Sequence, residues 1–189
     1  MATSRTTLTD VVIPRIENDP LVARVSDAVE QLAGGFTIDP DSVLRAGLLG
    51  HSVHPVLTDV PMGAWLSTSL LDLFGGVQAR PAAEKLLTVG IVTALPTAAT
   101  GAADMLSLGT LDRRVALVHA LGNDVALVLF IASRRARRKD RYRLGTVLAL
   151  AGNGLSAASG FLGGHLALKQ STGSGESHRL HHLVQRAAA

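Results

Sequence analysis

The chain contains no cysteine, and this absence excludes several kinds of chemistry. Disulfides, thiolate-bound zinc, iron–sulfur ligation and covalent attachment of c-type haem all require cysteine. Aromatic residues are also scarce, at 3% of the 189 residues, and charged residues make up only 17%. Hydrophobic residues make up 47%, and glycine and alanine fill much of the apolar sequence. This composition is typical of membrane helices, in which small residues let backbones approach closely.

The first 45 residues lack a long apolar run, and the opening residues lack the apolar middle of a secretory signal peptide. Within this polar region, residues 19–32 carry apolar side chains at helical spacing and are followed by two glycines. We expect a short amphipathic helix here, lying on the membrane surface or against the other helices. A soluble helix with no membrane role is the alternative.

Four apolar segments follow, at residues 56–74, 86–106, 115–133 and 144–168. Each is long enough to cross a bilayer, and the second and fourth carry a small residue at every fourth position. The sequence therefore predicts an all-α fold, an integral membrane four-helix bundle over residues 46–168. The remaining residues, 169–189, are rich in serine, glycine and histidine, and we expect them to form a flexible tail.

Basic residues are concentrated between the third and fourth segments, where seven of the 18 lie from Arg134 to Arg143. Because this cluster joins two apolar segments, it indicates membrane topology rather than a nucleic-acid partner. The two linkers on this side hold nine Lys and Arg residues, against five close to the helices on the opposite side. The positive-inside rule then predicts a multi-pass protein of the cell membrane with both termini outside.

Histidines and carboxylates gather at the predicted outer level of the bundle. Ionisable groups are costly inside a membrane, so such a cluster is a candidate functional site. Neutral imidazole is a common ligand of zinc, copper, nickel and iron, including haem iron. The alternative is that each histidine lies at the membrane interface and bonds to backbone or head groups. The candidate residues are His51, His54, His119 and His165, with Asp59 and Asp104 as further ligands or as partners that orient an imidazole.

The segment at residues 50–65, GHSVHPVLTDVPMGAW, resembles the opening motif of a bacterial membrane-protein family, domain of unknown function 2231. Members of that family begin with a Gly-His-Pro-x-His-Pro pattern before an apolar helix, and Ser52 replaces the first of these prolines here. The resemblance extends over about residues 48–168 and includes His119 and the Gly-Gly-His at residues 163–165. It implies four membrane helices. Some relatives are fused to Rieske or cytochrome modules, which implies redox work, although we expect this chain to lack such a module.

Three functions are compatible with these sequence features. In the first, His54 with His119, or His51 with His165, binds one b-type haem that exchanges electrons with quinone or with a redox protein at the outer face. In the second, the same histidines form a non-haem metal site with Asp59 or Asp104, and a metal-bound water is activated for catalysis. In the third, the chain binds no cofactor and is a scaffold or assembly protein in the lipid bilayer. A homo-oligomer is compatible with all three.

Overall fold

A computed structural model describes residues 6–33 and 53–187, with side chains described as far as Lys169. The described residues form six α-helices, one short 3-10 helix and no strand. The all-helical class is therefore confirmed, but the helices number six rather than four. They are α1 (Leu8–Glu17), α2 (Pro20–Ala33), α3 (His54–Phe74), α4 (Arg80–Leu106), α5 (Thr110–Arg137) and α6 (Tyr142–Ala187), with η2 (Val77–Ala79) before α4.

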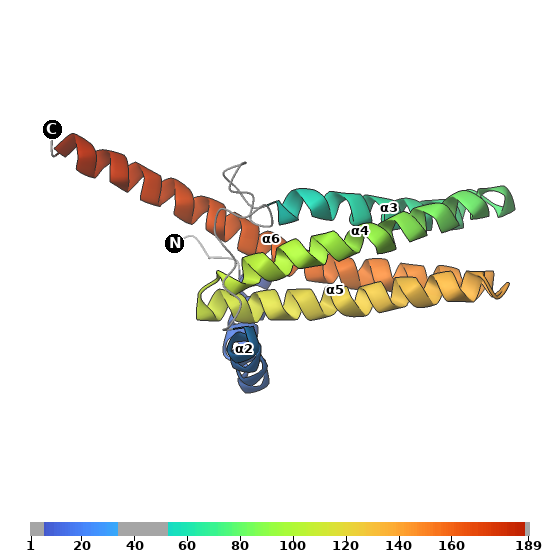
Figure 1. The fold of residues 1–189 in the computed structure, drawn as a ribbon, viewed down its shortest axis with the longest axis horizontal. Helices are drawn as coiled ribbons and strands as arrows, with labels where there is room; N and C mark the ends of the chain where they lie inside the picture. Colours follow the sequence, from blue (N-terminus) through green and yellow to red (C-terminus); the bar gives the residue numbers. More distant parts are fainter. Residues whose placement is uncertain (1–5, 34–52, 188–189) are drawn as a thin grey trace.

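Helices α3 to α6 pack together as two antiparallel hairpins (Figure 1). One hairpin is α3 with α4, and the other is α5 with α6. Across the hairpins, α4 contacts α5 and α3 contacts α6. Helices α3 and α5 are therefore diagonal to each other, as are α4 and α6. The α3–α4 and α5–α6 turns lie at the same end of the molecule (Figure 1).

Helices α1 and α2 both contact α5. The predicted amphipathic helix is present as α2, and its contacts favour the position against the other helices. Helix α1 was not predicted, because its apolar run is short. It begins with a capping box in which Thr7 and Asp10 bond reciprocally, and these bonds lower the pKa of the Asp10 carboxyl. Ile13 is buried against Val115 and neighbouring apolar residues.

Three of the described helical stretches are long and apolar enough to cross a membrane: Val77–Leu106, Thr110–Arg137 and Tyr142–Lys169. The sequence predicts that α3 also spans the membrane, but α3 is not among these three stretches. At 21 residues α3 has sufficient length, but Asp59, Asp72 and several hydroxyl side chains interrupt its apolar sequence.

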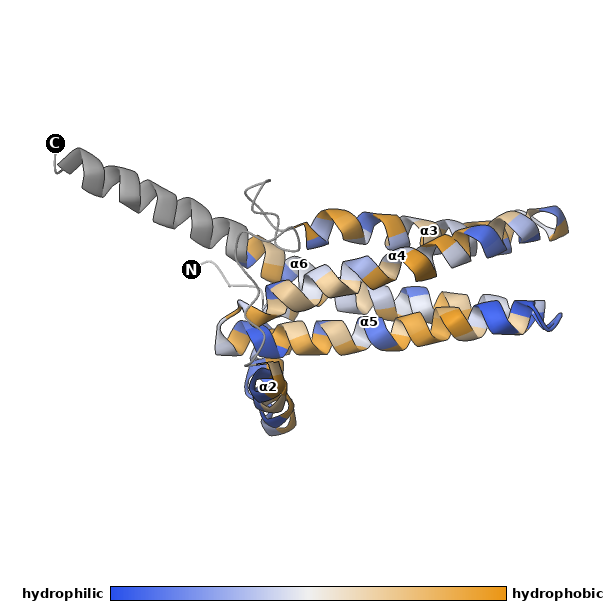
Figure 2. Cartoon of the chain, viewed as in Figure 1, coloured by the Kyte–Doolittle hydropathy of each residue, from blue (hydrophilic) through white to orange (hydrophobic). Residues whose placement is uncertain are grey.

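The four packed helices turn apolar side chains outward and hydroxyl groups inward, the reverse of a soluble bundle. Large aliphatic side chains are exposed along every one of them, including Leu66 on α3 at 57% and Val128 on α5 at 63%. Figure 2 shows apolar residues along the length of these helices and polar ones at the turn after α5. An apolar exterior matches lipid, and buried small polar residues allow close helix contact. The buried hydroxyl residues include Thr68, Ser69, Thr97, Thr100, Ser133, Ser156 and Ser159.

Helix α6 continues to Ala187, well beyond the predicted fourth segment. The residues after Lys169, expected as a flexible tail, are therefore helical. Their glycines and serines favour a loop over a helix, which is why the sequence did not indicate this extension.

Glycines at matching places let each hairpin close around an aromatic ring. Trp65 on α3 lies over Gly90 on α4, and Phe130 on α5 lies over Gly152 on α6. The two rings then stack on each other in the core, with centroids 4.0 Å apart and planes 15° from parallel. At Gly152 an added Cβ would lie 2.9 Å from the Phe130 ring, and at Gly90 it would lie closer still to Trp65.

We expect Gly152→Ala to destabilise the fold by about 1–3 kcal/mol, because the methyl group forces Phe130 and its stacked partner to move. Gly154→Ala is the matched control, since an added Cβ there meets no atom within 4 Å. Unfolding in a detergent titration measures both. Equal stability of the two variants would contradict the close approach of α5 and α6.

Candidate functional site

Two of the predicted histidines face each other in the space between the hairpins. His54 is the first residue of α3, and His119 lies in the first half of α5, the diagonal helix. Their ring centroids are 6.3 Å apart, and their planes stand at 89°. Both side chains are partly buried. The pairing thus joins the two halves of the bundle at the end opposite the basic turn.

Each imidazole is held by a main-chain carbonyl of its own hairpin. His54 Nδ1 lies 2.9 Å from the Thr97 oxygen on α4, and His119 Nδ1 lies 2.7 Å from the Ser159 oxygen on α6. A carbonyl oxygen only accepts, so each Nδ1 must carry a hydrogen. In a neutral ring the lone pair is then on Nε2. This is the arrangement of metal-binding histidines, which usually donate their other N–H to a carboxylate or carbonyl.

Asn123 lies one helical turn beyond His119, and its amide contacts the same ring. Asn123 Nδ2 is 3.3 Å from His119 Nε2, and it donates to the His119 carbonyl oxygen at 3.0 Å. The amide is therefore anchored on the main chain of α5. At the matching place on α3, Thr58 donates to the His54 carbonyl at 2.8 Å.

Glycine is required beneath both rings. A Cβ added at Gly101 on α4 would lie 2.7 Å from His54 Cε1, and one added at Gly163 on α6 would lie 2.6 Å from His119 Cε1. Each glycine is one helical turn after the carbonyl that fixes the ring. The two rings therefore make the same two contacts: each bonds to a main-chain carbonyl and packs against a glycine of the other helix in its hairpin.

Gly163→Ala is expected to displace the His119 ring and break its bond to Ser159, since the added methyl group cannot coexist with Cε1 at that distance. If a ligand is bound through the two rings, its affinity should fall by at least tenfold. Gly164→Ala is the control, because nothing lies within 4 Å of its added Cβ. Titration of the purified variants with haemin measures the difference. Equal affinities would show that the close contact between Gly163 and the His119 ring does not matter for ligand binding.

One spacing relates the residues that meet between α3 and α5. Asp72 and Arg137 are 65 residues apart and form an ion pair. The same spacing separates His54 from His119 and Trp65 from Phe130. The two hairpins therefore have similar arrangements, and residues of α3 contact the residues of α5 that lie 65 positions later in the chain. An offset of 65 residues within the sequence places all three pairs in register.

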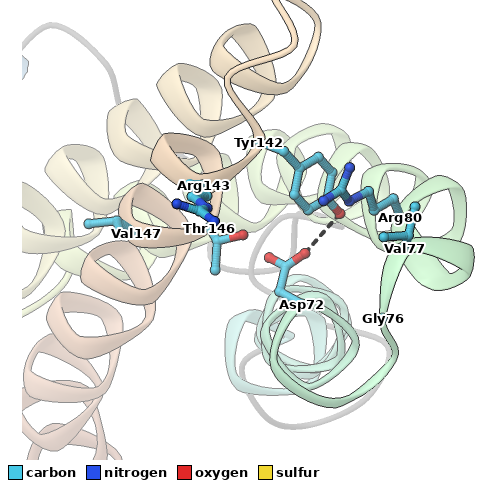
Figure 3. Close-up of a pocket in the computed structure, with 8 residues that line it drawn as sticks. All are labelled: Asp72, Gly76, Val77, Arg80, Tyr142, Arg143, Thr146 and Val147. Atoms are coloured by element: carbon cyan, nitrogen blue, oxygen red, sulfur yellow. Dashed lines mark hydrogen bonds between the residues drawn. The ribbon is translucent and has the colours of Figure 1, made fainter.

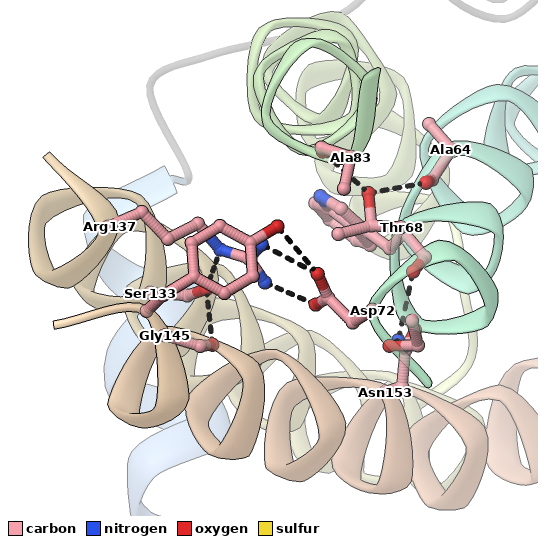
Figure 4. A network of polar contacts seen from close by, with 11 residues as sticks. Ala64, Thr68, Asp72, Ala83, Ser133, Arg137, Gly145 and Asn153 are labelled. Atoms are coloured by element: carbon pink, nitrogen blue, oxygen red, sulfur yellow. Dashed lines mark hydrogen bonds and ion pairs between the residues drawn. The ribbon is translucent and has the colours of Figure 1, made fainter. Parts of the chain in front are cut away.

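A second polar network lies at the other end of the bundle, near the basic turn. Arg137 donates to Asp72 through two nitrogens, one of them at 2.8 Å from Oδ1, and Tyr142 donates to the same carboxylate at 2.9 Å. The side chains of Asp72 and Arg137 are 0% and 1% exposed. Asn153 donates to the Trp65 carbonyl at 3.0 Å and to Ser69 (Figure 4). This network joins all four packed helices, with Thr68 of α3 bonded to the Ala83 carbonyl of α4.

The other candidate residues are not brought to the histidine pair by any described contact. His165 lies on α6 and is partly buried, Asp59 is exposed on α3, and Asp104 is partly buried near the end of α4. His51 lies outside the described residues. Among the described residues, no group of three or more His, Asp or Glu side chains could hold a metal ion.

The chemistry of the pair suits a metal centre that takes two ligands from the protein. His54 and His119 would be the residues that hold such a metal, because both imidazoles face the same space between the hairpins. With each Nδ1 bonded to a carbonyl, Nε2 would be the ligating atom of each ring, and Asn123 Nδ2, now 3.3 Å from His119 Nε2, would have to move aside.

A family model described as a predicted membrane protein (DUF2231) matches residues 50–176. The match begins at the glycine before His51 and covers helices α3, α4 and α5 and much of α6. It therefore includes the histidine pair, the aromatic stack and the buried ion pair. No curated protein and no solved structure matches the chain.

Proposed function

Because the chain belongs to the DUF2231 family of predicted membrane proteins, we propose that it binds one b-type haem in the membrane through His54 and His119 and transfers electrons. The observation that carries the proposal is the facing pair itself, with two diagonal helices presenting imidazoles whose Nδ1 atoms bond to main-chain carbonyls. Cofactor sites of helical bundles are built in this way, from side chains on facing helices. A bound haem would supply one-electron redox chemistry.

The choice of haem over a non-haem metal rests on the number of ligands. Catalytic zinc usually needs three protein ligands and an open position, and the described residues bring only two imidazoles together. Haem would bring the other ligands of its iron with it and would take only His54 and His119 from the protein. The facing imidazoles of His54 and His119 therefore support haem as the proposed cofactor.

The membrane setting of the proposal is a four-helix bundle in which α3 crosses together with the three apolar helices. Its outward residues support this, because Val60, Leu66 and Leu70 are each about half exposed and present an apolar surface. With the basic turn inside, the histidine pair lies near the outer face of the cell membrane. The electron partner would then be quinone or a redox protein on the outer side.

The chain's own residues would have three tasks at this site. Thr97 and Ser159 hold the imidazole orientation through their carbonyls, and Gly101 and Gly163 provide the space in which the rings sit. The stacked Trp65 and Phe130 close the core between the histidine pair and the polar network. These rings would keep water from the inner side of the site.

Visible spectra and metal analysis of the detergent-purified full chain, expressed with added haem precursor, test this function. The expected result is a reducible Soret and alpha band and one haem per chain. A colourless protein with one bound zinc or iron would replace the proposal with a metal-site enzyme. A colourless, metal-free protein would replace it with a cofactor-free scaffold.

A further inference from the structure

A second site lies at the basic end of the bundle, away from the histidines. An open pocket of about 450 Å³ is formed where η2 and the start of α4 meet the start of α6. Figure 3 shows Arg80 and Tyr142 on one side of this pocket and Arg143 with Thr146 on the other. A volume of this size is within the range of ligand-binding pockets.

The pocket has an excess of positive charge. Its one acidic residue is Asp72, whose carboxylate is already bonded by Arg137 and Tyr142. Arg80 lies over the Tyr142 ring at 4.3 Å and forms no ion pair within the described part of the chain. Arg143 is exposed and likewise has no carboxylate partner there. Two guanidinium groups are therefore available to an anion.

The walls of the pocket are apolar and face outward. Val77 is 68% exposed and Val147 is 61% exposed, and both line the pocket. Tyr142 and Thr146 line the same pocket, and the Tyr142 hydroxyl donates to Asp72. Arginine forks match phosphate oxygens, and an exposed valine wall beside them matches an acyl chain.

We propose that this pocket binds the phosphate group of an anionic phospholipid, with Arg80 and Arg143 as its ligands. Basic pockets between membrane helices on the cytoplasmic side bind lipid head groups in this way. The site is independent of the histidine pair and would exist whether or not haem is bound. Free phosphate carries the same chemical group, so the experiment has to separate the two sources.

Native mass spectrometry of the detergent-solubilised full chain tests the proposal with phosphatidylglycerol and phosphatidylcholine as probes. We expect the wild type to bind phosphatidylglycerol at least tenfold more tightly, and Arg80→Gln with Arg143→Gln to lose that preference. Arg135→Gln with Arg138→Gln is the matched control, because both residues are exposed in the same basic region and outside the pocket. Arg143→Gln alone, which disturbs no described contact, should lose part of the preference even if the double variant folds poorly.

If the pocket variant and the control lose the preference for phosphatidylglycerol equally, the proposal is overturned, because the lipid would then be attracted to the basic surface in general. A wild type without lipid preference that also fails to bind inorganic phosphate would overturn it as well. Inorganic phosphate that binds the wild type but not the pocket variant, without any lipid preference, would overturn the lipid as the source while keeping the phosphate site.

Discussion

Replacing His54 or His119 by leucine should abolish haem binding, with the Soret and alpha bands falling to below about a tenth of their wild-type intensity. Each imidazole is one of the two axial ligands in the proposed site, and leucine offers no donor atom. Leucine is of similar size and suits a partly buried, apolar setting, so the fold should persist. Haem content per chain and helicity by circular dichroism measure the two effects together.

His165→Leu is the matched control for this pair of variants. His165 is also partly buried near the same end of the bundle, but no described contact brings it to the histidine pair. We expect it to keep full haem content. If His165→Leu loses haem and His119→Leu keeps it, the ligands would be another pair, such as His51 with His165.

Asp72→Asn should destabilise the protein by about 3–5 kcal/mol, the largest stability effect that the structure predicts. The substitution removes the negative charge beside Arg137, whose side chain is 1% exposed, and leaves its positive charge buried without a counter-charge. The asparagine amide is nearly the same size as the carboxylate, so the effect reports charge rather than packing. The free energy of unfolding in a denaturing detergent series measures it.

The control for this prediction removes the whole network instead of half of it. In a variant that combines Asp72→Leu, Arg137→Met and Tyr142→Phe, no charge or buried hydroxyl is left without a partner at this place. We expect this variant to be more stable than Asp72→Asn, because replacing a buried ion pair by apolar groups is often neutral or stabilising. If the triple variant is less stable than Asp72→Asn, the bonds of the network stabilise the protein by more than the cost of burying its polar groups.

The helical class and the positions of the apolar helices were predictable because hydropathy and the spacing of small residues are properties of consecutive residues in the sequence. The family was predictable too, since GHSVHPVLTDVPMGAW is a local motif, and the match over residues 50–176 confirms that resemblance. Helix α1 and the extension of α6 to Ala187 were not predictable. The first depends on packing against α5, and the second contains residues with low helix propensity.

The contacts between helices were only partly predictable, because hydropathy does not reveal how each helix is rotated. The sequence offered His54 with His119 as one of two pairings, and the structure brings these rings together. In the sequence, Arg137 counts only as part of the basic cluster, and nothing along the chain links it to Asp72. Their pairing depends on α3 and α5 being diagonal, which follows from the arrangement of the two hairpins.

Electron paramagnetic resonance of the oxidised, detergent-purified wild type tests the central claim most directly. With imidazole planes at 89°, two axial histidines predict a low-spin ferric signal of strong anisotropy, one centre per chain. A high-spin signal that is unchanged in His54→Leu and His119→Leu would contradict ligation by this pair. A protein that shows no ferric haem signal after expression with haem precursor would contradict the haem itself.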